Sequence, residues 1–147
     1  MNEPPSDREV VNTRVLNAPR EKVFKAWKEA RHLSEWWGPK DFKNTFHLFE
    51  PKPGGNWRFT MHGPDGTDYP NECVFEVVRP DKIVLNHISP PHYFRLTVTF
   101  EEQGDKTKLV WRQRFETKEH CDRVREFVHQ ANEQNLDRLE AELAKMA

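Results

Sequence analysis

Five turn-forming segments, spaced through the middle of this 147-residue chain, restrict its fold more than any other feature. They lie at residues 51–55, 63–66, 79–82, 89–91 and 103–106. Each contains Gly, Pro, Asp or Ser residues that favour tight reversals of the backbone. The stretches between the turns have the length of strands and are rich in Val, Ile, Phe, Thr and Trp. Strands joined by such short turns pair with their neighbours, so the pattern predicts an antiparallel meander.

Seven strands are predicted in all, one of them well before the first turn. Their predicted limits are residues 8–17, 42–50, 56–62, 69–79, 83–88, 93–102 and 107–115. Apolar and polar side chains alternate in three of these strands: Phe94, Leu96 and Val98, for example, share one face. Such alternation is typical of a sheet with one buried face and one solvated face.

Three helices are predicted outside the strands. Pro19 suits the start of a short helix, because its missing N–H leaves no bond unmade there. A second short helix, about residues 31–37, ends at Gly38-Pro39. Thr117 is a suitable N-cap for a long helix over residues 118–145. The order is therefore strand, two short helices, six strands and a long helix.

The long helix carries an unusual apolar stripe. At about 100° per residue, six apolar side chains gather on one side of it. They are Cys121, Val124, Val128, Ala131, Leu139 and Leu143. Asn132 and Asn135 fall within the same stripe, and these amides either bond the sheet or face a ligand and water. The acidic run of residues 133–142 is interpreted as the solvated back of the helix.

These elements predict an α+β fold, with helices segregated to one side of an antiparallel sheet. A sheet of six to seven strands curls as its twist accumulates, and a curled sheet around one helix leaves a hollow. Residues 1–7 are predicted as a flexible tail and residues 8–147 as a single domain.

Composition argues against several classes of protein. The net charge is −1 and no run of Lys or Arg exceeds two residues, so we expect no nucleic-acid partner. No apolar run approaches the roughly 18 residues of a membrane span. The polar N-terminus lacks a signal region, which predicts a cytoplasmic protein. Cys73 and Cys121 form no Cys-x-x-Cys pair and are predicted as buried thiols.

Several motifs, in order along the chain, resemble one superfamily. Residues 18–27 are similar to the first helix of the START-like, or Bet v 1-like (SRPBCC), superfamily. Residues 33–39, with their adjacent tryptophans, and the Pro-Gly-Gly turn in residues 53–59 resemble its branch related to the activator of Hsp90 ATPase. Residues 79–84 and 135–139 are similar to that branch as well.

The resemblance implies a helix-grip fold. In it, a curved antiparallel sheet of about six to seven strands wraps around a long C-terminal helix, with two short helices between the first and second strands. An internal cavity is implied too, but no single function, because one fold hosts many functions. Where the branch often carries Gly-Trp, this chain has Ala131-Asn132, so we expect a roomier and more polar cavity.

Eleven residues are predicted to line this cavity, from the alternation of faces and from the resemblance. They are Trp37, Trp57, Phe59, Met61, Phe94, Leu96, Trp111, Gln113, Val128, Asn132 and Asn135. For each tryptophan the alternative is ordinary core packing. As a group the five tryptophans favour a partly hollow interior, since indole N–H groups need partners.

No recognised catalytic constellation is present. His87 and Glu76 are the candidates for acid–base chemistry in a cavity. The alternatives are a histidine bonded to a neighbouring strand, and a glutamate that points outward beside Arg58 or Arg112. His87 and His92 flank a Ser-Pro-Pro turn, but no metal-ligand spacing accompanies them. We therefore expect neither a metal nor a cofactor.

The sequence thus predicts a protein that binds a small hydrophobic or amphipathic molecule, aromatic or lipid, in an internal cavity. One alternative is an Hsp90-type cochaperone or stress-related interaction module, with a chaperone as partner. A second alternative is a cyclase-like enzyme that uses a cavity His or Glu, although binding without catalysis is favoured. A monomer or a weak homodimer is expected.

Overall fold

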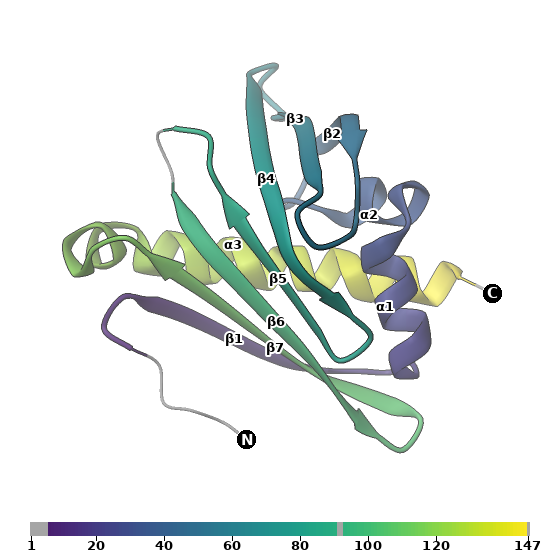
Figure 1. The fold of residues 1–147 in the computed structure, drawn as a ribbon. Helices are drawn as coiled ribbons and strands as arrows, with labels where there is room; N and C mark the ends of the chain where they lie inside the picture. The colour runs from purple at the N-terminus through teal and green to yellow at the C-terminus, as the bar shows by residue number, and fades with distance from the viewer. Residues whose placement is uncertain (1–5, 91–92, 147) are drawn as a thin grey trace.

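The computed structural model of the chain describes residues 6–90 and 93–146 (Figure 1). Its elements are β1 (Glu9–Leu16), α1 (Arg20–Lys28), α2 (Ala30–Trp36), β2 (Lys43–Phe49), β3 (Asn56–His62), β4 (Asp68–Arg79), β5 (Lys82–His87), β6 (Phe94–Gln103), β7 (Lys106–Phe115) and α3 (Lys118–Lys145). The strands and α3 begin and end within one residue of their predicted limits. Residues 1–5 of the predicted tail lie outside the described residues.

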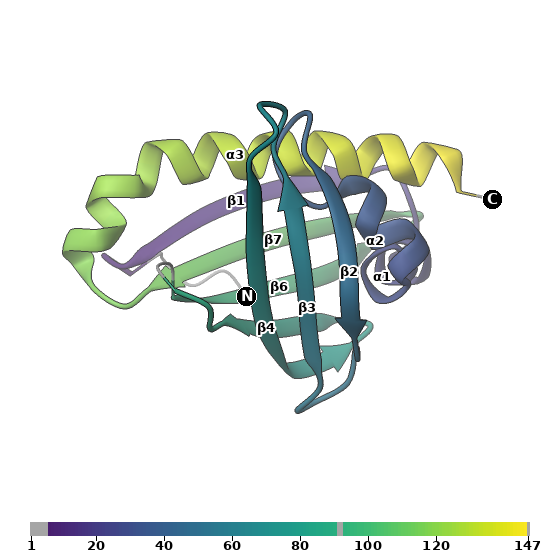
Figure 2. The same cartoon turned by 90° about the horizontal axis from the view of Figure 1, so that it is seen from above.

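All seven strands form one antiparallel sheet in the order β1-β7-β6-β5-β4-β3-β2. From β2 to β7, each strand pairs with the next along the chain, as a meander requires. β1 pairs with β7 and forms one edge. Figure 2 shows β1 running alongside α3, whereas β2, β3 and β4 run across the direction of that helix. The α+β helix-grip architecture predicted from the sequence is confirmed.

Irregular positions in β2 and β4 help the sheet to curl. The register shifts after Phe46 in β2 and after Phe75 in β4. An extra residue in one strand bends that strand and increases its local twist. In the turn before β3, a Cβ atom on Gly55 would collide with the carbonyl oxygen of Glu50, so this tight turn requires glycine.

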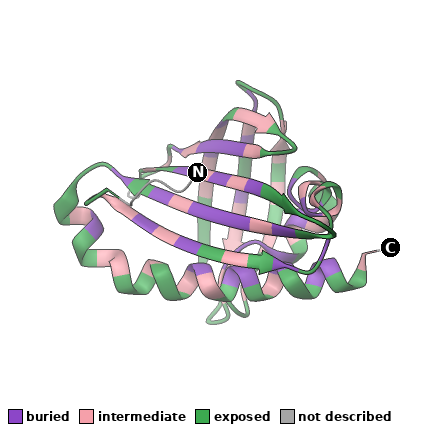
Figure 3. Ribbon diagram, turned by 90° about the horizontal axis from the view of Figure 1, so that it is seen from below, coloured by how far each residue is buried: buried purple, intermediate pink, exposed green. Residues whose placement is uncertain are grey.

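The buried side chains of the strands form one core, and Figure 3 shows buried and more exposed residues alternating along the strands, as predicted. In β6, Leu96, Val98 and Phe100 are buried and alternate with more exposed side chains. The main cluster of buried side chains includes all five tryptophans and three leucines of α3. A second, smaller cluster forms around Val10, Phe115 and Cys121 near the start of α3. The core is therefore divided along the length of α3.

α3 begins as predicted, because the Thr117 side chain accepts a hydrogen bond from the backbone N–H of His120 at 3.0 Å. Its buried residues are Cys121, Asn132, Asn135, Leu136, Leu139, Glu142 and Leu143. Val124, Val128 and Ala131 of the predicted stripe are only half-buried. The apolar stripe is thus covered at the C-terminal end of α3 and less covered at the N-terminal end.

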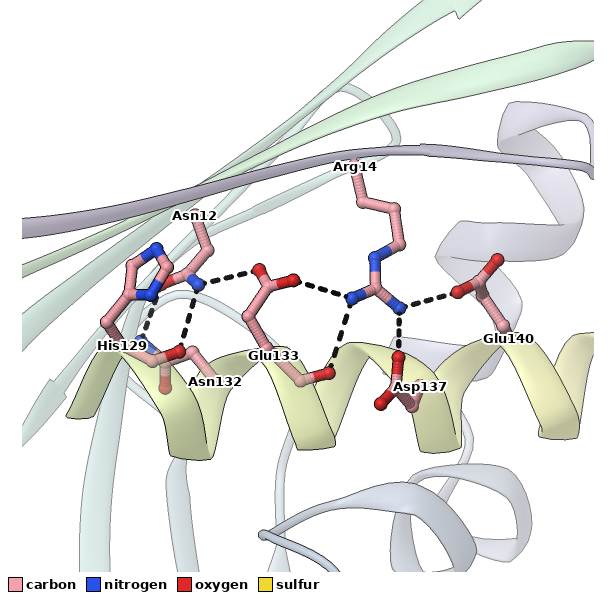
Figure 4. Close-up of polar contacts among 7 residues, drawn as sticks. All are labelled: Asn12, Arg14, His129, Asn132, Glu133, Asp137 and Glu140. Atoms are coloured by element: carbon pink, nitrogen blue, oxygen red, sulfur yellow. Dashed lines mark hydrogen bonds and ion pairs between the residues drawn. The ribbon is translucent and has the colours of Figure 1, made fainter. Parts of the chain in front are cut away.

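Acidic residues of α3 bind strand β1 (Figure 4). The Arg14 guanidinium forms ion pairs with Glu133, Asp137 and Glu140, which lie on successive turns of the helix. The interpretation of this acidic run as the solvated back of the helix is wrong for Glu142, which is 9% exposed and bonds His32, whereas Asp137 and Glu140 are exposed and pair with Arg14 at the surface. Because α3 lies alongside β1, a long arginine on that edge strand reaches them.

Candidate functional site

A pocket of about 230 Å³ lies between the concave face of the sheet and the N-terminal half of α3. β3 to β7 supply one side, α3 the other, and residues 37–39, which link α2 to β2, close one end. Side chains of both core clusters line it. Phe127 lies at its rim and is 73% exposed, so the pocket reaches the surface beside that residue.

The adjacent tryptophans of residues 36–37 occupy different environments. Trp37 lines the pocket and stacks on Trp111, with ring centroids 5.6 Å apart and an angle of 19° between the rings. Behind it, Trp27 and Trp57 contact Trp37 edge-on at 5.8 Å and 5.1 Å. Trp36 is fully buried, and its Nε1 donates to a backbone carbonyl of α1 at 3.0 Å. Trp36 therefore belongs to the core, while Trp37 forms an aromatic wall.

Residues 35–39 are held in place by one arginine. The guanidinium of Arg138 on α3 donates to the backbone carbonyl oxygens of Glu35, Trp37, Gly38 and Pro39 at 2.8–3.0 Å. Hydrogen bonds from a charged donor are about twice as strong as those between neutral groups. Arg138 thereby fixes the end wall of the pocket to α3.

Asn135 adds two bonds to the same segment. Its Oδ1 accepts from the backbone N–H of Gly38, and its Nδ2 donates to the carbonyl of Trp36, both at 3.1 Å. Gly38 has a φ of 98°, and a Cβ atom there would lie 2.7 Å from the Met61 side chain. The positive φ favours glycine at this position, whereas the flexible end of the Met61 side chain could move to make room for a Cβ atom. Asn135 was expected to bond the sheet or to face a ligand and water, but both of its bonds are made to residues 36–38, at the end of α2.

A chain of buried amides runs from β1 to the pocket (Figure 4). Asn12 donates through Nδ2 to the His129 carbonyl at 3.1 Å and to Glu133 Oε2 at 2.8 Å. The His129 carbonyl and the Glu133 carboxylate can only accept hydrogen bonds, so the Nδ2 of Asn12 must face them. Its Oδ1 then faces Asn132 and accepts from Asn132 Nδ2 at 3.1 Å. The orientation of the Asn132 amide is therefore set from β1.

Gln113 on β7 is oriented in the same way. Its Oε1 accepts from the Trp111 indole N–H at 3.3 Å and from Asn132 Nδ2 at 3.2 Å. An indole N–H only donates, so the oxygen of Gln113 must lie on that side. Within the described part of the chain, Gln113 Nε2 and Asn132 Oδ1 have no hydrogen-bond partner. The pocket wall thus presents one amide donor and one amide acceptor.

His87 lines the opposite side of the pocket and stacks on Phe94, with ring centroids 4.7 Å apart. Asn71 donates through Nδ2 to the Tyr69 carbonyl, which turns its Oδ1 toward the histidine. His87 Nε2 therefore donates to Asn71 Oδ1 at 2.7 Å. This is the arrangement of a histidine bonded to a neighbouring strand, although its ring also faces the pocket.

Ten of the eleven residues predicted for the cavity line this pocket. They are Trp37, Phe59, Met61, Phe94, Leu96, Trp111, Gln113, Val128, Asn132 and Asn135. Whether they bind a ligand stays a prediction.

Trp57 does not line the pocket, although it shares a face of β3 with Phe59. It is fully buried, stacked on Phe59 at 4.2 Å and covered by Trp37. Its placement in the cavity was wrong, because alternation along a strand gives the face but not the depth of a side chain. Its Nε1 has no hydrogen-bond partner within the described residues.

Glu76 does not face the pocket either. It lies exposed at the irregular position of β4 and pairs with the guanidinium of Arg95, at 2.9 Å and 2.6 Å. A hydrogen bond from Asn86, together with Arg95, lowers the pKa of Glu76. Glu76 therefore points outward, as the alternative interpretation expected, but its partner is Arg95 and not Arg58 or Arg112. Of the two candidates for acid–base chemistry, only His87 reaches the pocket, and His92 lies outside the described residues.

Several lining residues were not predicted. They are Gly38, Pro39, Asn71, Phe115, His120, Val124, Phe127 and Ala131. Phe115 continues the buried face of β7, and Val124 and Ala131 belong to the helical stripe, so the patterns contained them. Asn71 shares a face with Cys73 and Phe75, but its polar side chain gave no reason to select it.

Neither a cluster of metal-ligating side chains nor a membrane-spanning helix occurs among the described residues. Among them, no three side chains of His, Cys, Asp or Glu lie close enough together to hold a metal ion. No helix within residues 6–90 and 93–146 is long and apolar enough to cross a membrane.

Solved structures share the fold of this chain. A protein from Arthrobacter aurescens matches with a TM-score of 0.88 and 22% sequence identity, over 99% of this chain and 91% of that one. A protein from Nitrosomonas europaea matches with a TM-score of 0.87 and 18% identity, over 95% and 96% of the two chains. A protein from Rhodobacter sphaeroides gives 0.87 and 20%, over 99% and 97%. At these identities the likeness shows the fold alone.

Family membership follows from the sequence comparison. Among curated proteins, the comparison finds no match. The family model described as "Activator of Hsp90 ATPase homolog 1-like protein" matches residues 17–144. That range extends from the end of β1 through almost all of α3 and includes every element that encloses the pocket. The chain therefore belongs to the Activator of Hsp90 ATPase homolog 1-like family.

Proposed function

We propose that the protein binds a small apolar molecule in the pocket beneath the N-terminal half of α3. The observation that carries the proposal is the interruption of the core at this place. Aromatic and aliphatic side chains form most of the wall, and a few oriented amides and His87 supply polar contacts. This combination of an apolar wall with few polar groups is typical of small-molecule sites.

The test is calorimetric titration of the purified protein with naphthalene, a rigid apolar probe. The variant Ala131→Trp places an indole where a half-buried alanine lines the pocket. We expect it to weaken naphthalene binding by at least about tenfold, because the side chain takes the place of the ligand. A matched control is Ala141→Trp, an exposed position on the same helix, which should bind as the wild type does.

Thermal unfolding without ligand separates filling of the pocket from damage to the fold. Filling a cavity commonly stabilises a protein by about 0.5–2 kcal/mol, so Ala131→Trp should keep or raise the melting temperature. Unchanged naphthalene binding by this folded variant, or no binding by the wild type, would contradict the proposal.

Contact with a chaperone is a second candidate, supported by the family description and by Phe127. A large apolar side chain that is 73% exposed is a suitable contact for a partner. Purified Hsp90 provides the test, through direct binding and stimulation of its ATPase. Phe127→Ser should abolish both effects, and their absence with the wild type would remove this candidate.

A further inference from the structure

We infer that the ligand is a small, uncharged, planar molecule that has a hydrogen-bond acceptor and a hydrogen-bond donor side by side, as in a bicyclic aromatic lactam. This inference rests on the proposed function and specifies the chemical class of the ligand. It follows from the size of the pocket, the absence of charge in its described lining and the orientation of two amides.

Size sets the first limit. The pocket measures about 230 Å³. An engineered apolar cavity of about 150 Å³ holds benzene, whereas sites for drug-sized molecules occupy about 300–1,000 Å³. A ligand of one or two fused rings therefore fits, whereas a lipid with long acyl chains would leave much of each chain outside the pocket. The stacked wall of Trp37 and Trp111 favours a flat ring system, because aromatic faces pack on one another.

Charge sets the second limit. Among the described residues that line the pocket, none is Asp, Glu, Lys or Arg. A charged group buried without a partner costs far more free energy than a neutral polar group. An ammonium group inside the pocket would find no carboxylate among the described lining residues, and a carboxylate could pair only with a protonated His87 or His120, so the buried part of the ligand is neutral.

The two amides set the third limit. The bond that Gln113 accepts from Trp111 and the bond that Asn132 donates to Asn12 orient the two amides so that Gln113 Nε2 and Asn132 Oδ1 are left for a ligand. Asn132 also donates to Gln113 at 3.2 Å, so the free donor and the free acceptor belong to two amides in direct contact. A ligand with a carbonyl beside an N–H or O–H satisfies both, whereas a pure hydrocarbon leaves both unpaired.

A ligand series on the wild-type protein tests the inference by calorimetry. Quinolin-2-one carries the carbonyl and the N–H, quinoline carries an acceptor alone, and naphthalene carries neither. Each hydrogen bond gives a modest net gain, so quinolin-2-one, which can form two, should bind at least about fivefold tighter than naphthalene, with quinoline between them. The anions 2-naphthoate and laurate should bind more weakly than naphthalene.

Gln113→Met tests the donor directly, because it keeps the length of the side chain and removes both amide atoms. The preference for quinolin-2-one over naphthalene should fall to within about threefold, while Gln103→Met, an exposed change on β6, should keep it. If Gln113→Met does not fold, the order of ligands on the wild type still decides.

The outcomes separate the inference from the proposed function. Naphthalene binding without any preference for quinolin-2-one, or tighter binding of 2-naphthoate or laurate, would overturn the inference and leave a binding pocket. Failure of every probe to bind would overturn both.

Discussion

The two halves of α3 face the same sheet, yet they meet it differently. In the C-terminal half, Leu136, Leu139 and Leu143 are buried in the main core. In the N-terminal half, Val124 and Val128 are half-buried and line the pocket. The short helices α1 and α2 lie near the C-terminal half and supply tryptophans to the core there (Figures 1 and 2).

This difference in packing explains why the pocket lies beneath the N-terminal half of α3. A curved sheet and one long helix do not stay in contact along their whole length, and α1 and α2 fill the space at one end only (Figure 2). At the other end the space stays open, and polar bonds to β1 hold the helix there: Asn12 binds the His129 carbonyl and Glu133. The packed half thus stabilises the fold, while the open half contains the pocket.

Trp37 stands at the boundary between the halves, and Trp37→Ala should have the largest effect. It removes a side chain that is 7% exposed and contacts four other tryptophans. We expect a loss of about 3–5 kcal/mol in the free energy of unfolding, measured with urea. Phe127→Ala, at the exposed rim, should change it by no more than about 0.5 kcal/mol. A loss below about 1 kcal/mol for Trp37→Ala would show that the packing of Trp37 contributes little to stability.

A matched pair within α3 tests the contrast itself. Leu139→Ala in the packed half should cost about 2–5 kcal/mol, because the surrounding core cannot collapse around the missing atoms. Val128→Ala beside the pocket should cost no more than about 1 kcal/mol, because the valine is only half-buried and the substitution removes fewer atoms than Leu139→Ala does. The measurement is again urea unfolding. Equal losses would break the comparison, since they would mean that both halves are packed alike.

Asn12→Ala tests whether polar bonds hold the open half. It leaves Asn132 and Glu133 each without one buried partner, which should cost about 1–3 kcal/mol in the free energy of unfolding. Thr13→Ala, exposed on the same strand, serves as the control and should change it little. An Asn12→Ala variant as stable as this control would show that the amide chain does not hold the helix.

The smallest effect concerns acid. Burial raises the pKa of Glu133, but hydrogen bonds from Asn12 and Arg14 outweigh it and lower the pKa below its ordinary value of 4.5. A lowered pKa means that this carboxylate stabilises the fold above about pH 4.5, and that the contribution is lost as the pH falls through the lowered value. Glu133→Gln should therefore make the decline in unfolding free energy between about pH 5 and 3 shallower.

This effect should be small, because the Glu133 side chain is 42% exposed and solvent screens it. Glu126→Gln, at an exposed position of the same helix, is the control and should follow the wild-type curve. If the two variants have the same pH dependence, Glu133 contributes nothing to acid sensitivity, and the ion pairs beside it must carry the contact with β1.

The sequence predicts the fold more completely than the site because the two depend on different ranges of interaction. Turn residues fix the strand limits locally, and Thr117 fixes the start of α3 through a bond to a residue three positions away. Trp57 shows what such local patterns omit, because only distant residues decide whether a side chain on the correct face reaches the pocket.

The same limit applies to the polar groups. The partners of Arg14 lie more than a hundred residues away along the chain, and no periodicity in either segment indicates the pairing. The outward position of Glu76 depends on a register shift between β4 and β5. Asn132 and Asn135 stood out because they interrupt an apolar stripe, and that local signal was sufficient to select them.

The contacts of Arg138 have a consequence for engineering. A backbone carbonyl oxygen is the same atom whatever side chain its residue carries, so this arginine holds residues 35–39 without regard to their identity. Gly38 is the exception, since its left-handed backbone disfavours other residues. Pro39, whose side chain lines the pocket, can be exchanged for residues of another size or polarity while the loop keeps its place. The shape of the end wall can therefore be changed without rebuilding its support.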